Sequence, residues 1–199
     1  MTSRVPWWVL TSSAVAPVAL IGGWTLAARR QPGGFDGTVE TISALAGHGA
    51  AGRWLMTAAL VCVGICHLVT AAGLHPAARA GRAVLAAGGV ATMLVAVFPL
   101  PVAGPAPAHG AAAGLAFAAL SVWPALAWRR HVPAPVTLRP LVSCAAAAVL
   151  LALVAWFAVT LVLGGRAGLT ERVAAGAQAC WPLVVALSSR WAVAPRRRD

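Results

Sequence analysis

Runs of apolar residues recur along the chain and alternate with short polar segments. A membrane hydrocarbon core of roughly 30 Å is crossed by about 20 apolar residues in a helix. The pattern predicts six such spans in a single domain over residues 1–199, at about 7–28, 54–74, 83–103, 110–128, 141–163 and 173–193. We therefore expect an all-α, polytopic membrane protein whose six transmembrane helices form one bundle.

Residues 35–54 form the one long polar interruption, between the first two predicted spans. Asp36 and Glu40 are four positions apart, and apolar residues recur every three or four positions over 39–46. This spacing is typical of a short helix with one polar and one apolar side. We expect a short interfacial helix in this first outer loop, lying on the membrane surface or folded as a lid over the bundle.

Composition excludes a soluble protein, because 60% of the residues are hydrophobic and only 10% are charged. A soluble domain of this size could not bury so many apolar helices. The formal net charge is +11, and every basic residue is an arginine. The arginines lie in the short loops between spans, which is typical of membrane topology rather than of nucleic-acid binding. We expect membrane lipids as partners and no nucleic acid, and protein partners and oligomeric state stay open.

The arginines also predict the orientation. An even number of spans places both termini on one side of the membrane. Ten arginines fall on that side: Arg4, Arg79, Arg82, Arg129, Arg130, Arg139, Arg190, Arg196, Arg197 and Arg198. Five fall on the other: Arg29, Arg30, Arg53, Arg166 and Arg172. Because basic loops are retained on the inner side, we expect a multi-pass cell-membrane protein with both termini in the cytoplasm.

With this topology, the polar groups capable of chemistry gather on the outer face. The candidate outer cluster is Asp36, Glu40, Ser43, His48, Arg53, His109, Glu171 and Arg172. If the first outer loop folds over the bundle, these side chains could share one ligand-binding pocket. The structural alternative is that Asp36 caps the surface helix, and that Thr170 and Glu171 stabilise the start of the sixth.

His67 lies within the second predicted span, in the inner half of the membrane. An ionisable group at that depth is a functional-site hypothesis, and a neutral imidazole bonded to a neighbouring hydroxyl or carbonyl is the alternative. Gln178, Thr92, Ser121 and Thr160 suggest hydrogen bonds between helices.

Small residues inside the spans predict where helices cross closely. The pair Gly88-Gly89 and the run from Gly110 to Gly114 lack the bulk that would keep two backbones apart. We expect close helix contacts at both places.

Three short motifs resemble those of a known family of six-helix bacterial membrane proteins, the domain of unknown function 998 (DUF998). The motifs are Asp36 with Glu40–Leu45 and Arg53–Met56, then Phe98-Pro99 with His109–Ala112, then Gly168–Arg172. The resemblance covers nearly the whole chain and implies an integral membrane protein with no established activity. Many members carry an acidic residue between the Phe-Pro and the His, whereas this chain has only apolar residues, Gly and Pro there. This departure disfavours a carboxylate-rich metal site.

Three functions remain compatible with these features. The first is a protein that binds a lipid headgroup or small polar ligand in an extracytoplasmic pocket. The second is a membrane-embedded, metal-dependent hydrolase or lipid-modifying enzyme that uses His48, His109, Asp36 and Glu171. The third is a small transporter. No phosphate loop, nucleophile elbow, nucleotide fingerprint or zinc-ribbon spacing occurs, so we assign no catalytic residue, cofactor or metal ligand and leave enzymatic activity open.

Overall fold

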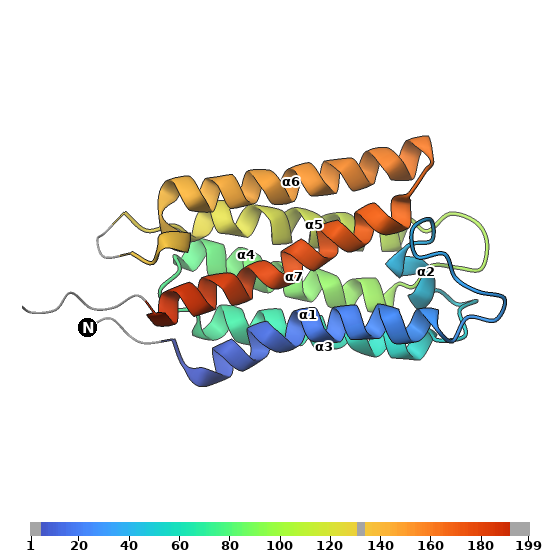
Figure 1. The fold of residues 1–199 in the computed structure, drawn as a ribbon, viewed down its shortest axis with the longest axis horizontal. Helices are drawn as coiled ribbons and strands as arrows, with labels where there is room; N and C mark the ends of the chain where they lie inside the picture. The colour runs from blue at the N-terminus through green and yellow to red at the C-terminus, as the bar shows by residue number, and fades with distance from the viewer. Residues whose placement is uncertain (1–4, 131–133, 192–199) are drawn as a thin grey trace, which may run out of the picture.

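The computed structural model describes residues 5–130 and 134–191, and within them every regular element is a helix (Figure 1). The predicted all-α class is therefore confirmed. The elements are α1 (Trp7–Ala28), α2 (Ile42–Ala46), α3 (Arg53–Gly73), α4 (Arg79–Val97), α5 (Pro107–Ala127), the short 3₁₀ helix η1 (Val136–Leu138), α6 (Pro140–Leu163) and α7 (Ala167–Trp191).

Five of these helices are long and apolar enough to cross a membrane, namely α1, α3, α4, α5 and α6. The sixth long helix, α7, has 25 residues but is not among the five, since it carries more polar residues. Its outer turns contain Thr170, Glu171 and Arg172, and its interior contains Gln178.

Helix boundaries differ from the predicted spans where proline or capping chemistry decides them. α4 ends at Val97 rather than near 103, because a residue that precedes a proline, such as Phe98, disfavours helical geometry. α7 begins at Ala167 rather than 173, so Thr170 is not its N-cap but donates back to the Ala167 carbonyl. Residues 192 and 193 of the predicted sixth span lie outside the described residues.

The helix of the first outer loop is shorter than the sequence pattern suggested. Thr41, not Asp36, is its N-cap and accepts a hydrogen bond from the Ala44 amide. Ile42, Leu45 and Ala46 are buried against the bundle, which fits the lid alternative.

The six long helices form a closed ring in the order α1, α3, α4, α5, α6, α7 and back to α1. Figure 1 shows α7 crossing the bundle obliquely, from beside the end of α6 to the end where α1 begins. α2 and the loop around it lie at the opposite end, which we call the outer end, and the end where α1 begins is the inner end. The arginines of the terminal segments, Arg4 and Arg196 to Arg198, lie outside the described residues.

Two core clusters fill the bundle, one at each end. The outer cluster joins α2 residues such as Leu45 to Met56 and Leu60 of α3. The inner cluster contains Trp123 of α5 and Leu85 of α4. α6 contributes little to either cluster, and most of its large apolar side chains are exposed on the outside of the ring. In a membrane that surface would face lipid.

The backbones of α3 and α4 approach each other closely at two glycines. A Cβ atom added to Gly64 would lie 2.6 Å from the Gly89 carbonyl oxygen, and one added to Gly89 would lie 2.7 Å from the Gly64 carbonyl oxygen. Only glycine fits at both positions, because the obstacle is backbone and cannot move aside. The predicted close crossing at Gly88-Gly89 is confirmed. Gly110 and Gly114 have nothing within 4 Å of such an atom, so these two glycines make no close contact, although Ala112 between them is buried in a core cluster.

Candidate functional site

The first outer loop is fastened to the start of α7 by an arrangement we call the clasp, made of residues 36–43 and 168–172. Arg172 Nη1 donates to the carbonyl oxygens of Gly37, Glu40 and Gly168 at 2.7, 2.8 and 2.9 Å. Backbone amides of Gly168 and Leu169 donate to carbonyls of the loop at 3.0 and 2.9 Å. The guanidinium group of Arg172 is therefore occupied by the protein's own backbone.

Gly168 makes the clasp possible because its lack of a side chain lets the loop approach. A Cβ atom at this position would collide with the Glu40 carbonyl oxygen and lie 2.7 Å from that of Gly37. The same approach permits the backbone hydrogen bonds from the start of α7. The third family-like motif, Gly168–Arg172, thus acts as the helical half of the clasp.

Glu171 is the buried acidic group of the clasp, and its side chain is only 3% exposed. Its carboxylate accepts hydrogen bonds from the Ile42 amide and from the Ser43 hydroxyl, the latter at 3.1 Å. Glu171 therefore joins α7 to α2.

The other two acidic residues of the outer cluster lie on the surface. Asp36 Oδ1 accepts hydrogen bonds from the Thr38 amide and hydroxyl at 2.8 and 2.7 Å, and the hydroxyl contact lowers the pKa of Asp36. Glu40 Oε1 accepts a hydrogen bond from the Asp36 amide at 3.0 Å. Both carboxylates shape the exposed turn of the loop through these hydrogen bonds.

His48, Arg53 and His109 lie apart from the clasp. Arg53 Nη1 donates to His48 Nδ1 at 2.7 Å and stacks over Trp54, with 4.4 Å from its central carbon to the ring centroid. His109 Nδ1 donates to the Phe98 carbonyl at 2.8 Å and so ties the proline-rich loop to α5. His48 and His109 line an open surface groove beside that loop.

The eight outer residues therefore do not share one pocket. Asp36, Glu40, Ser43, Glu171 and Arg172 belong to the clasp, whereas His48 and His109 face the surface groove and Arg53 supports His48. Over residues 5–130 and 134–191, no three or more His, Cys, Asp or Glu side chains gather where they could hold a metal ion.

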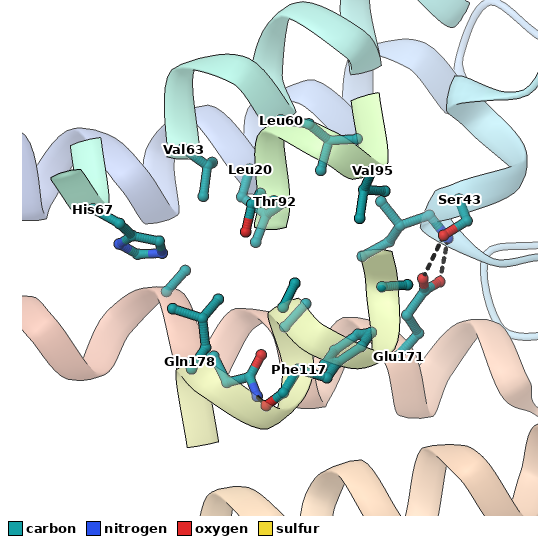
Figure 2. Close-up of a pocket in the computed structure, with 16 residues that line it drawn as sticks. Leu20, Ser43, Leu60, Val63, His67, Thr92, Val95, Phe117, Glu171 and Gln178 are labelled. Carbon is teal, nitrogen blue, oxygen red and sulfur yellow. Dashed lines mark hydrogen bonds between the residues drawn. The ribbon is translucent and has the colours of Figure 1, made fainter. Parts of the chain in front are cut away.

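Beneath the clasp lies a partly open pocket, which we call the chamber, and residues of α1, α2, α3, α4, α5 and α7 line it (Figure 2). Ser43 and Glu171 lie at its outer end, and His67 lies at its inner end. Its volume is about 70 Å³. A cavity needs about 10–15 Å³ to hold one water molecule, so the chamber has room for several waters or one narrow ligand.

The chamber is long and narrow. Its lining runs from Leu60 to His67 on α3, from Ala113 to Leu120 on α5 and from Glu171 to Ala179 on α7. At 1.5 Å per residue, each stripe is roughly 10–12 Å long. A chamber of this volume and length is wide enough for only one chain of atoms, such as a single alkyl chain.

His67 is fully buried, and neither of its ring nitrogens has a hydrogen-bond partner among the described residues. The structural alternative from the sequence, a ring bonded to a hydroxyl or carbonyl, is therefore not what the described residues provide. Gln178 and Ser121 do bond between helices as predicted, at 2.8 Å, and so do Thr160 and Thr170 at 2.7 Å. Thr92 instead donates to Gly88 of its own helix.

Sequence reasoning missed the walls of the chamber. They are ordinary apolar side chains, such as Leu20, Val63 and Val95. The only available signal was a set of polar residues inside spans, since His67, Thr92 and Gln178 all line the chamber. Their convergence depends on how five helices are rotated, which no single helix pattern reports.

Comparisons with known proteins identify a family and give no activity. No curated protein and no solved structure matches the chain. Residues 14–188 match the family described as protein of unknown function DUF998, which is most of the chain. The matched region includes all three motifs noted in the sequence, the clasp and every residue that lines the chamber. The chain belongs to the DUF998 family.

Proposed function

We propose that the protein crosses the cell membrane six times, with α7 as the sixth span, α2 at the outer interface and both termini in the cytoplasm. The length of α7, its place in the ring and the two-to-one arginine bias support this topology. The test is a reporter fused after Asp199 that is active only in the cytoplasm. An active reporter agrees with the proposal, and one active only on the outer side overturns it.

Within that topology, we propose that the protein binds one small, largely apolar molecule inside the bundle. The observation that carries the proposal is the chamber itself, which five long helices line and the clasp covers at its outer end. Natural cores are packed with few voids larger than a water molecule, so a chamber of this length is an exception that a ligand would explain.

The chamber favours a different ligand from the lipid headgroup considered for the outer cluster. None of the side chains that line it is a lysine or an arginine, and Arg172 is bonded to backbone carbonyls above it. A buried phosphate without a paired cation would cost several kcal/mol. A narrow, uncharged molecule is the class that this lining accommodates.

Two alternatives have less support. A metal-dependent hydrolase needs several ligands at one point, whereas Asp36, His48, His109 and Glu171 are divided between the clasp and the groove. A transporter needs a path to the other side. The inner core cluster, which includes Leu120 of the chamber wall together with Trp123 and Leu85, lies across that path.

Native mass spectrometry of the protein extracted from its own membrane tests the proposed binding. We expect one non-phospholipid adduct per chain that survives removal of the surrounding lipid and disappears after exhaustive detergent exchange. The adduct should be soluble in organic solvent and should lack phosphate. A chain that carries only phospholipid, all of it lost together on mild activation, would overturn the proposal.

A further inference from the structure

His67 is the one group in the chamber whose hydrogen-bonding capacity is clearly unmet. Its side chain is 0% exposed, and both Nδ1 and Nε2 lack a partner among the described residues. Figure 2 shows the ring at the inner end of the chamber, across from Gln178. A buried polar group without a partner is destabilising, so a hydrogen-bonding molecule in the chamber would stabilise this ring.

The neighbouring polar groups define what that partner must offer. Gln178 Nε2 donates to the Phe117 carbonyl at 2.9 Å and to Ser121 Oγ at 2.8 Å, which uses both of its hydrogens. Its side-chain oxygen is left for the chamber (Figure 2). Thr92 Oγ1 donates to Gly88 and keeps only accepting capacity. An uncharged imidazole adds one donor and one acceptor.

At the outer end of the chamber, the polar groups already have hydrogen-bond partners. The Glu171 carboxylate already accepts hydrogen bonds from the Ile42 amide and the Ser43 hydroxyl. Between the two ends the lining is apolar and includes Leu20, Leu60 and Val95. A polar group is therefore needed at the inner end, and an apolar chain fits the remainder.

We propose that His67 is a binding residue for the hydroxyl group of a single-chain alcohol, which enters the chamber head first with its apolar tail toward the clasp. A hydroxyl both donates and accepts, so it can bond to either ring nitrogen of His67, whichever of them carries the hydrogen. A carboxylate or phosphate head would lack a cation among the lining residues. This inference rests on the proposed function, because it names the ligand class of the same chamber.

The experiment uses the full chain in phosphatidylcholine nanodiscs with its histidine rings labelled with ¹⁵N. The chain has five histidines, so the ring signals are few, and loss of signals in His67→Gln assigns those of His67. The probes are 1-octanol and octane, which have the same chain length and differ only in the hydroxyl group. Octanol should shift the His67 ring signals in a saturable way, whereas octane should not, because ring nitrogens respond to hydrogen bonding.

A chamber-filled variant separates binding from a change in the bilayer. Ala116 lines the chamber, so Ala116→Leu should abolish the octanol-dependent shift, and Ala118→Leu, an exposed position on the same helix, should preserve it. Equal shifts with octane, an unchanged shift in Ala116→Leu, or no shift with octanol would each overturn the inference. If His67 is silent but the native adduct persists, only the inference fails. If the adduct is absent as well, the proposed function fails with it.

Discussion

Individual residues of the clasp connect the outer loop to the bundle through unlike kinds of contact. Arg172 bonds to three backbone carbonyls, Gly168 permits close approach, and Glu171 supplies a buried carboxylate to α2. Because Ile42 and Ser43 also line the chamber, the contacts of Glu171 help to hold its cover in place.

Gly168→Ala should detach the loop from α7. The added methyl group would meet the backbone carbonyls of Glu40 and Gly37, so the clasp must open by more than a side-chain adjustment. We expect a loss of about 1–3 kcal/mol and faster amide hydrogen exchange at Ile42. Gly176→Ala is the matched control, because a methyl group there meets only Trp24 at an ordinary 3.8 Å. Equal effects of the two substitutions would argue against the clasp.

The sequence identified most of the polar residues at the outer end, but not how they divide between the clasp and the surface groove. It assigned Asp36, Glu171 and Arg172 to the same face, and the structure joins them through the clasp. It could not separate His48 and His109 from that group, because their places depend on the proline-rich loop. Nor could it show that His67 lacks a partner, since that depends on side chains from other helices.

At the scale of elements, the long helices follow from apolar runs of sufficient length, and proline and capping residues move their ends. Two helices pack closely where a small residue on one of them lies against the backbone of the other. Gly64 and Gly89 lie against each other across α3 and α4, whereas Gly110 and Gly114 lie in open space. The sequence shows all four as small residues in spans and does not show which of them meets a neighbouring backbone.

Substitution of these glycines should separate close packing from helix propensity. Gly64→Ala should destabilise the protein by about 2 kcal/mol or more, because its methyl group would meet the Gly89 carbonyl. Gly114→Ala should be neutral or stabilising by up to about 1 kcal/mol, since alanine is the better helix former. Thermal unfolding in nanodiscs measures both. A loss in Gly114→Ala as large as that in Gly64→Ala would contradict the α3–α4 contact.

For the whole molecule, the ring of helices matters more than any one motif. Five helices of the ring, together with α2, contribute to the chamber lining, and α6 lies outside it. The number of long helices and their positions along the chain were predictable from the hydrophobic pattern alone. The chamber was not, because most of its lining residues are the alanines, leucines and valines found on every side of these helices.

Native mass spectrometry of a protein whose chamber has been filled tests whether the bound molecule lies inside the bundle. Ala116→Leu adds bulk to the lining and removes no polar group, and Ala118→Leu makes the same change on the exposed side of α5. Both variants should remain folded. We predict that the copurified adduct of the wild type is lost in Ala116→Leu and retained in Ala118→Leu. Equal retention in the two variants would show that the bound molecule lies elsewhere and would contradict the account.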